Sequence, residues 1–386
     1  MPAHIDLPHN PIETPVIAIA GWVAAQTPPR SITVAVNGTT IPHELATRPD
    51  VRDAMADFVF TSGVTAMANL LSLPPATRLD IVIDADGDRA ARRMEVADAL
   101  YAHWSDDGAI RAANRAFCLA RLICPARRAG TASLDIRPRA IRCRACGTEF
   151  AQNGTALDMI SVKLAIEANL VSSANVSANP YTPEALALIE RVTSRGGVVL
   201  DCGAGSRPLR MKGVVNLEIV DYASTDVLAI GEALPFADAS FDGALSLAVL
   251  EHVRDPFRCA RELLRVVKPG GELLIDVPFL QPVHGFPHHY YNMTAQGLSN
   301  LFGDGARVLS CVVPPHGHPI FGVQWLLRDY LAGLPADVAA DFGAMTVNDI
   351  VALNAPAFLG DPRAHMLNPD AQTTVACLNS LHIWKL

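Results

Sequence analysis

An apolar run followed at once by a glycine turn limits the fold of this chain more than any other feature. Residues 198–200 read Val-Val-Leu, and Asp201 ends the run. Gly203 and Gly205 come next, and glycine adopts positive φ without the steric penalty that other residues meet. Ligands of open parallel sheets bind beyond the carboxyl ends of the strands. The sequence therefore predicts a ligand-binding turn after a buried strand, although Ser206 stands where a third glycine often occurs.

Strand and helix patterns alternate after residue 183. Apolar runs typical of buried strands occur at 198–200, 214–217, 243–247 and 272–277, and helical patterns occur at 184–193 and 256–267. Asp255 suits the N-cap of the second helix and Pro256 its first turn, while Lys-Pro-Gly-Gly at 268–271 ends it. Alternating elements with short connections predict an α/β fold, in which helices cover both faces of a parallel sheet.

Several motifs follow the glycine turn in a fixed order. Glu218 closes the next strand pattern, where a carboxylate can accept both hydrogen bonds of a ribose diol. The segment 234–242 reads Leu-Pro-Phe-Ala-Asp-Ala-Ser-Phe-Asp, 250–252 reads Leu-Glu-His, and 262–271 reads Glu-Leu-Leu-Arg-Val-Val-Lys-Pro-Gly-Gly. Together these motifs resemble the class I methyltransferases of small molecules, which use S-adenosylmethionine. The resemblance covers residues 198–301.

This resemblance implies a Rossmann-like sheet of seven strands and a cofactor site at its carboxyl edge. It implies that Asp201, Gly203 and Gly205 hold the methionyl part of S-adenosylmethionine. It also implies that Glu218 holds the ribose hydroxyls.

The adenine and sulfonium contacts follow from the same resemblance. Ala233 and Leu234 would border the adenine, and Leu247 would lie beneath the sulfonium. Many relatives carry an acid where this chain has Ile230, so the remaining adenine contact would come from Asp226 or from backbone groups.

A histidine-rich loop follows the last strand pattern of the sheet. It contains His284, His288 and His289, and histidine can act as a base near neutral pH, which transfer to a hydroxyl requires. The alternatives are that these side chains only line the pocket, or that the three histidines bind a metal, for which no acidic partner stands out. His252, beside Glu251, is interpreted as shaping the pocket. The loop resembles those of bacterial methyltransferases encoded with surface-glycan biosynthesis, and apolar helices expected over 322–350 would cover it.

Three cysteines are spaced like part of a zinc ribbon. Cys124 precedes Cys143 and Cys146, but Arg127 occupies the expected fourth position. A complete site needs four nitrogen or sulfur ligands. Cys118 is a substitute ligand, and the alternative is a degenerate ribbon held by its core alone.

The region before residue 89 has the pattern of a small all-β domain. Apolar runs at 16–23 and 31–36 predict strands, and Asn37-Gly38 predicts a hairpin turn. The pattern resembles a β-sandwich attached to bacterial glycosyltransferases, which implies an accessory module that binds a glycan, a glycosyltransferase partner or another copy. We expect this domain over 12–88, a helical linker with the ribbon-like segment (118–153) over 89–170, and the methyltransferase domain over 180–386.

Composition limits the remaining function classes. The formal net charge of −8 argues against a dedicated nucleic-acid binder, and no apolar run has the roughly 20 residues of a membrane span. The N-terminus lacks a signal-peptide pattern, so we expect a cytoplasmic protein. The leading hypothesis is methyl transfer from S-adenosylmethionine to a small-molecule or glycan acceptor, at oxygen. The arginine-rich stretch 111–144 makes an rRNA or tRNA methyltransferase the second hypothesis, and a non-catalytic binding protein the third.

Overall fold

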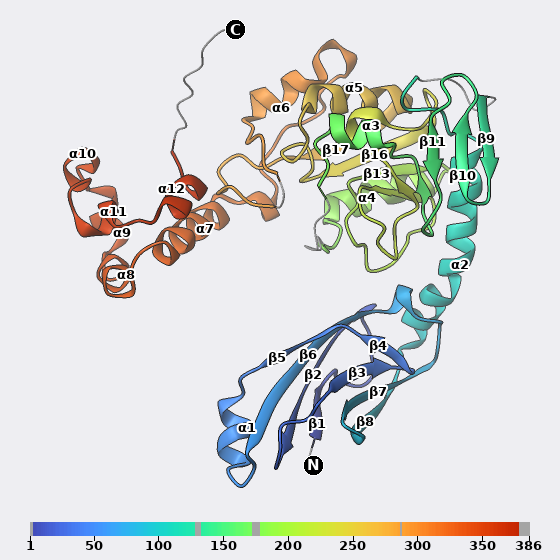
Figure 1. Cartoon of the computed structure of the whole chain (residues 1–386). Coiled ribbons are helices and arrows are strands. Elements are labelled where there is room, and N and C mark those ends of the chain that lie inside the picture. The colour runs from blue at the N-terminus through green and yellow to red at the C-terminus, as the bar shows by residue number, and fades with distance from the viewer. Residues whose placement is uncertain (1–2, 128–132, 172–177, 286–287, 378–386) are drawn as a thin grey trace.

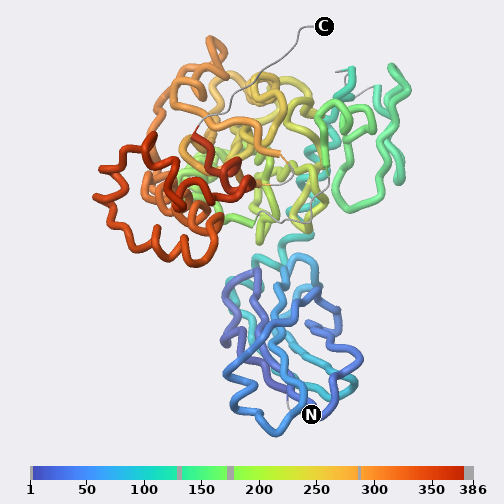
Figure 2. The backbone as a smooth tube through the Cα atoms, turned by 60° about the vertical axis from the view of Figure 1, so that its left-hand side comes forward, coloured from blue at the N-terminus to red at the C-terminus, as the bar shows by residue number. Residues whose placement is uncertain are grey.

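The computed structural model describes residues 3–127, 133–171, 178–285 and 288–377. An N-terminal β unit is joined by one long helix to an α/β unit, and a group of short helices follows at the C-terminal end (Figures 1 and 2). Within this described part of the chain, no helix combines the length and apolar character needed to cross a membrane.

Two four-stranded antiparallel sheets form the N-terminal unit. One has the order β1 (Ala3–Leu7), β2 (Val16–Ala25), β6 (Phe60–Asn69) and β5 (His43–Ala46); the other has β4 (Thr39–Ile41), β3 (Ile32–Val36), β7 (Arg78–Ala85) and β8 (Asp88–Glu95). Their inner faces share one apolar core that includes Ile19, Val64 and Ile81. Asn37 and Gly38 both have positive φ and close the β3–β4 hairpin, as the sequence predicts.

The expected helix does not begin at residue 89, because residues 88–95 form strand β8. Asp86 and Gly87 both have positive φ and make a tight hairpin between β7 and β8. This Asp-Gly signal was missed at the sequence level. Met94 is buried while the residues on either side of it are exposed. Burial that changes from one residue to the next is typical of a strand and not of a helix.

Helix α2 (Asp98–Leu119) connects the two units. Its first half packs on the β unit through Leu100 and Trp104, and the Trp104 indole N–H donates to the carbonyl of Leu73 at 3.2 Å. Its last turn packs on the α/β unit through Cys118. The helix therefore belongs to both cores.

The central sheet of the α/β unit has six parallel strands in the part of the chain described. Their order is β12 (Leu157–Asp158), β15 (Val227–Leu228), β14 (Val214–Glu218), β13 (Val199–Cys202), β16 (Phe241–Leu247) and β17 (Val267–Asp276). The described residues contain no seventh strand of the kind that the resemblance implies, and the six-strand count includes β12, which precedes the glycine turn.

Successive residues of β13 enter two different cores. Val199 packs with α4 (Pro183–Thr193), whereas Leu200 packs in the core that contains α5 (Pro256–Val266). The strand is thus buried on both faces, which explains its continuous apolar run. Asp255 caps α5 by accepting the N–H of Arg258 at 2.9 Å, so the predicted start of this helix is confirmed.

A small antiparallel sheet lies beside the central one. It consists of β9 (Leu134–Arg137), β10 (Ala140–Cys143) and β11 (Glu149–Ala151), and it is followed by α3 (Val162–Glu167). Ile141 and Phe150 of this sheet are buried in the same core as Leu200.

Short helices make up the chain after β17. They are α6 (Ala295–Phe302), α7 (Pro319–Ala332), α8 (Ala336–Gly343), α9 (Val347–Val351), α10 (Ala355–Phe358), α11 (Pro362–His365) and α12 (Pro369–Thr374). Leu334, Phe342 and Leu367 form a separate small core among the last six. The helical pattern expected over 322–350 is confirmed by α7, α8 and α9.

Candidate active site

The glycine turn follows β13 at the carboxyl edge of the sheet. Gly203 and Gly205 have φ values of 79° and 68°, in a region that L side chains rarely adopt. The N–H groups of Gly203 and Ala204 donate to the carbonyl of Leu217 at 2.9 and 3.1 Å, which fixes the turn to the end of β14. A β-carbon at position 203 would lie only 2.4 Å from Val249. Glycine is therefore required at position 203 for both its backbone and its size.

Asp201 is fully buried beneath the turn. Its Oδ2 accepts hydrogen bonds from the Tyr181 hydroxyl at 2.6 Å and from Nη2 of Arg207 at 2.9 Å. Burial raises the pKa of Asp201, while Arg207 and Tyr181 favour the ionised form. The other oxygen, Oδ1, has no hydrogen-bond partner among the described residues. One acceptor of this fixed carboxylate is therefore available to a ligand.

Glu218 lies at the end of β14, next to the same turn. Its Oε1 accepts the N–H of Gly205 at 3.3 Å, and its Oε2 accepts the N–H of Ile219. Burial raises the pKa of this half-buried carboxyl. Each carboxylate oxygen has a second lone pair, so Glu218 can hold a diol beside the turn.

Asp226 has a structural role that the sequence did not predict. Its Oδ1 accepts from Nε of Arg210 at 3.1 Å, and its Oδ2 accepts from the Asn114 amide and the Asn216 N–H, both at 2.9 Å. Arg210 is 1% exposed and also pairs with Asp107 of α2 at 2.8 Å. Groups of the chain itself therefore occupy the carboxylate that was expected near the adenine.

The other two residues expected near the adenine are buried around the 3₁₀ turn Gly231–Ala233. The N–H of Leu234 donates to Glu262 at 3.1 Å, and its carbonyl accepts from Arg265 at 3.0 Å. The backbone groups of Leu234 are thus already paired. Ala233 contributes its buried methyl group to a small core, while Leu247 is half-buried at the end of β16.

Glu251 lies on the connection between β16 and α5 and is fully buried. Its Oε1 is 3.7 Å from Nε2 of His252 and 4.0 Å from Nε2 of His284. Neither carboxylate oxygen has a hydrogen-bond partner in any other described residue. Burial raises the pKa of Glu251 to about 7, and the nearby charge of Asp276 adds to this effect. Sequence reasoning had treated Glu251 only as a neighbour of His252.

Two of the three loop histidines join His252 in one cluster. The rings of His252, His284 and His289 lie 4.5–5.5 Å apart and nearly perpendicular to one another. Burial lowers the pKa values of His252 and His284, so both favour the neutral form. His288 points elsewhere, with its Nε2 3.0 Å from the Asn169 side chain. The sequence groups His288 with His284 and His289, but in the structure its side chain lies apart from theirs.

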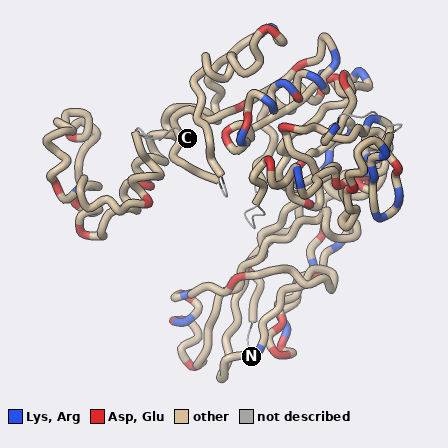
Figure 3. The backbone as a smooth tube through the Cα atoms, turned by 45° about the horizontal axis from the view of Figure 1, so that its top comes forward, with Lys and Arg blue, Asp and Glu red and all other residues tan. Residues whose placement is uncertain are grey.

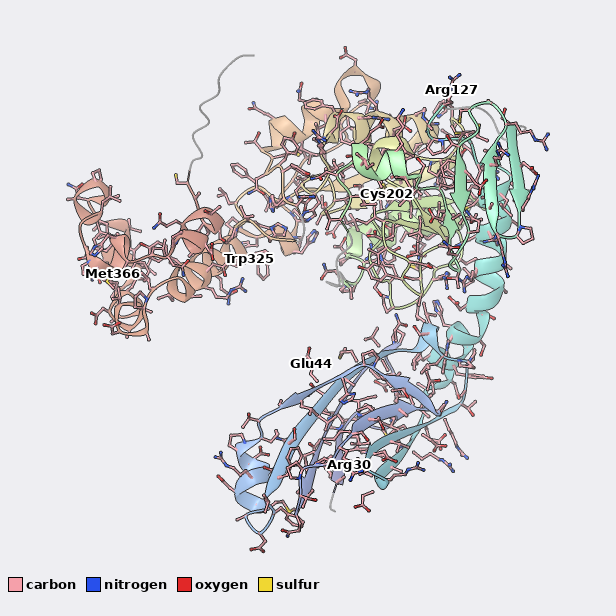
Figure 4. The ribbon with its side chains drawn as sticks, viewed as in Figure 1. Arg30, Glu44, Arg127, Cys202, Trp325 and Met366 are labelled. Carbon is pink, nitrogen blue, oxygen red and sulfur yellow. The ribbon has the colours of Figure 1, made fainter. Side chains whose placement is uncertain are left out.

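Helix α7 covers the histidine loop from the C-terminal side. The Trp325 ring centroid is 5.1 Å from that of His284, and a β-carbon on Gly322 would lie 2.5 Å from the Leu280 carbonyl oxygen. Figure 4 places Trp325 at the edge of the α/β unit that faces the C-terminal helices. His316, which no sequence motif marked, lies 3.1 Å from Asp276 at the end of β17. These contacts place the C-terminal helices beside the candidate acceptor site.

The three predicted cysteine ligands converge. The Sγ atoms of Cys124, Cys143 and Cys146 lie within 4.8 Å of one another. A hydrogen bond with the Thr148 hydroxyl is the main reason that the pKa of Cys146 is lowered to about 7, whereas burial raises that of Cys124 to about 12. Cys118 is fully buried in the α/β core and does not join this cluster.

Arginines of the cysteine segment do not form one uniform face. Arg137 pairs with Asp135 at 2.7 Å, and the Arg121 guanidinium stacks 3.8 Å from the Phe117 ring. Figure 3 shows acidic positions interspersed with the basic ones over the α/β unit. Arg127 lies on the far side of this unit from Trp325 in Figure 4.

Residues 210–275 match the sequence model of a family described as a methyltransferase domain. This part of the chain is therefore similar in sequence to a methyltransferase domain. The match begins after the glycine turn and ends within β17, so it includes Glu218, Glu251 and His252. The glycine turn before it and the histidine loop after it complete the candidate site of the methyltransferase domain.

Two curated relatives are consistent with this similarity. An uncharacterised methyltransferase of Mycobacterium tuberculosis is 44% identical over 94 residues, which are 24% of this chain and 34% of that protein. An uncharacterised methyltransferase of Mycobacteroides abscessus is 40% identical over 102 residues, which are 26% and 36% of the two chains. The chain thus spans about a third of the length of these curated relatives. A solved S-adenosylmethionine-dependent methyltransferase of Aquifex aeolicus aligns over 34% of this chain and 87% of its own, with 22% identity and a TM-score of 0.25.

Proposed function

We propose that this protein transfers a methyl group from S-adenosylmethionine to a hydroxyl of a small-molecule or glycan acceptor. The observation that carries the proposal is the juxtaposition of the glycine turn with Glu218, whose Oε1 accepts the N–H of Gly205 at 3.3 Å. This arrangement stands at the carboxyl edge of a parallel sheet, where ligands of such folds bind. The methyltransferase-domain match over residues 210–275 supports the same reaction class.

The residues present fit the cofactor. Asp201 has an unpartnered, buried Oδ1 that can accept from an ammonium group, and Gly203 and Gly205 bring backbone close to a ligand. Glu218 would hold the ribose hydroxyls. S-adenosylmethionine supplies a methyl group on a sulfonium that is already activated.

The protein then has two tasks, which are to orient the acceptor and to accept its proton. Neutral His252 and His284 each direct an Nε2 atom toward Glu251, next to the end of β16. Trp325 of α7 packs against His284 and would exclude water from an acceptor bound there. A hydroxyl acceptor is favoured over an amine because the histidine cluster offers proton acceptors.

Calorimetry tests the cofactor half of this proposal. S-adenosylmethionine should bind the full chain in the micromolar range, and Glu218→Ala should weaken binding at least about tenfold because the diol loses a charged hydrogen-bond partner. Glu184→Ala, on the exposed start of α4, is the matched control and should leave binding unchanged. Absence of binding heat with the unaltered protein would overturn the proposal.

A labelled-methyl screen tests the acceptor half. Metabolite, glycan and RNA fractions are incubated with the protein and methyl-labelled cofactor. Label in the metabolite or glycan fraction is the expected outcome, and a product stable to mild acid and base is expected for a methyl ether, whereas a base-labile product would be a methyl ester. Label confined to RNA would refute the acceptor class.

We also propose a structural zinc ion at the cysteine cluster. Cys124 and Cys146 have their Sγ atoms 3.7 Å apart, and Cys143 completes three converging thiols. The lowered pKa of Cys146 favours the thiolate that zinc requires. Elemental analysis should find at least one zinc per chain, and Cys143→Ser should reduce the zinc content. Zinc-free protein with unchanged thermal stability would argue for a ribbon that its core alone maintains.

A further inference from the structure

Three potential metal ligands meet at the acceptor side of the methyltransferase domain. They are a carboxylate oxygen of Glu251, and one ring nitrogen each of His252 and His284, all within 4.8 Å of one another. They come from two separate segments, the β16–α5 connection and the histidine loop. Gly285 allows these segments to meet, because a β-carbon there would lie 2.5 Å from the His252 ring.

Backbone carbonyls fix the proton position on both histidines. Nδ1 of His252 lies 2.7 Å from the carbonyl oxygen of His288, and Nδ1 of His284 lies 3.0 Å from that of Pro282. A carbonyl oxygen only accepts, so each Nδ1 carries the proton and donates it. Each Nε2 is then unprotonated, and its lone pair is directed toward Glu251. Metal-binding histidines are oriented in this way, with the second ring nitrogen donating to a carbonyl or carboxylate.

The contact is unfavourable without a cation. Glu251 is fully buried, and neither of its oxygens accepts a hydrogen bond from another described residue. The Nε2–Oε1 separations of 3.7 and 4.0 Å are too long for hydrogen bonds. Three acceptor atoms therefore face one another across a buried space, and a buried charge needs a partner.

We propose that Glu251, His252 and His284 bind a divalent transition-metal ion. Two imidazoles and one carboxylate are a common donor set for zinc and for non-haem iron, and such sites keep positions open for substrate. Ligands about 2.0–2.2 Å from a tetrahedral ion lie roughly 3.3–3.5 Å apart. The observed separations are a few tenths of an ångström wider, so small side-chain rotations would close the site.

The neighbouring His289 is not a fourth ligand. Its Nδ1 accepts the N–H of His284 at 3.1 Å, and its Nε2 lies 2.9 Å from the Asn292 side-chain oxygen. Both ring nitrogens are engaged, which leaves the ring to pack against His284. The open positions of the ion would therefore face the acceptor.

The ion would give the acceptor site a specific chemistry, which rests on the function proposed above. A hydroxyl bound to a divalent ion ionises more easily, releasing its proton to solvent and leaving an oxygen nucleophile. With the ion bound, His252 and His284 would act as ligands and the ion would replace them in promoting loss of the acceptor proton. Acceptors with two adjacent oxygens would bind best, because they can occupy two open positions. The protein would then select vicinal diols or catechol-like groups.

Cobalt(II) titration of the full chain tests the site, because its spectrum distinguishes ligand types. We expect a saturable visible absorption component of a nitrogen–oxygen site, separate from the near-ultraviolet thiolate band that the cysteine cluster would add. Glu251→Gln should weaken this component by more than about 100-fold, since outer-shell changes alone cost 10–100-fold. His288→Gln is the matched control, because that side chain points to Asn169, and it should leave the component unchanged.

The second readout is thermal stability in the presence of cobalt(II) or zinc. The ion should raise the Tm of the unaltered protein and of His288→Gln by more than that of Glu251→Gln, which keeps only the cysteine cluster. The Tm of metal-free Glu251→Gln shows whether a lost spectrum reflects lost ligation or lost folding. Absorption that contains only the thiolate band, or a nitrogen–oxygen component that persists in Glu251→Gln, would overturn the metal site. Because these titrations need neither cofactor nor acceptor, they are independent of the calorimetric test of methyl-transfer function.

Discussion

Two fully buried carboxylates, Asp201 and Glu251, stand on the two sides of the candidate active site and differ in their partners. Asp201 is paired with Arg207 at 2.9 Å and accepts the Tyr181 hydroxyl at 2.6 Å. Glu251 has no hydrogen-bond partner in another described residue, and the nearest groups are the histidine nitrogens. The chain thus completes the cofactor side with its own charges, whereas the acceptor side keeps a carboxylate for an external partner.

Removing Arg207, the charged partner of Asp201, should leave Asp201 without a counter-charge, like Glu251. Of the changes considered, this one should have the largest effect on the free energy of unfolding. Arg207→Leu leaves a fully buried carboxylate without its counter-charge, which we expect to lower the free energy of unfolding by about 3–5 kcal/mol. Urea unfolding measures this change. The exposed Arg195→Leu is the control and should change stability by less than about 0.5 kcal/mol. If Arg207→Leu lowers the free energy of unfolding by less than about 1 kcal/mol, Asp201 does not depend on its partner and does not differ from Glu251 in this respect.

On the acceptor side, substitution of Glu251 should stabilise the protein instead of destabilising it. In chelator at pH 8, Glu251→Gln should raise the free energy of unfolding by about 1–3 kcal/mol, because a neutral amide replaces a buried carboxylate that lacks hydrogen bonds. Denaturant unfolding of the metal-free proteins checks this. Destabilisation by the substitution would mean that the carboxylate has an internal partner, and the comparison with Asp201 would fail.

Cofactor affinity should depend on pH through Glu218. Its pKa is raised by burial in the free protein, and the ribose hydroxyls need the ionised carboxylate as acceptor. Binding should therefore be full above the raised pKa and weaken up to about tenfold per pH unit as pH falls below it. Calorimetry across this range is the measurement. Glu218→Gln should bind weakly with no such slope, and an equal slope in both proteins would assign the effect to another group.

The smallest effect is expected for a substitution in α7, the helix that covers the histidine loop. Trp325→Ala removes the ring packed 5.1 Å from His284 and should raise the acceptor KM roughly fivefold, about 1 kcal/mol. The affinity for S-adenosylmethionine should not change, because Trp325 packs against His284 on the acceptor side. Steady-state kinetics measure the acceptor KM, and calorimetry measures the affinity for S-adenosylmethionine. The exposed Val323→Ala in the same helix serves as control, and a fall in cofactor affinity would show that α7 acts on both sides.

The position of the glycine turn beside Glu218 could be predicted because these residues are close in sequence. A strand, a glycine turn and an acid after the next strand are placed together by any parallel sheet, so Gly203, Gly205 and Glu218 follow from local pattern. Capping is equally local, and Asp255 begins α5 as expected.

The acceptor side depends on contacts that no local pattern encodes. His252 and His284 meet through Gly285, and their tautomers depend on the carbonyls of Pro282 and His288. A motif that groups the three loop histidines cannot show that His288 points to Asn169. The partners of Asp226 could not be predicted for the same reason, since Asn114 belongs to α2, far earlier in the chain.

The pairing of Arg210 with Asp107 and Asp226 has a consequence for how this protein could have been assembled in evolution. A recombination event just ahead of the glycine turn would inherit Arg210 and Asp226 without Asp107 and Asn114, and each of the two buried charges would lose one hydrogen-bond partner. Exchange of the N-terminal module that keeps these bonds therefore needs a breakpoint before Asp107. The unit that such an exchange must keep intact extends from the α/β sheet back into the linking helix α2.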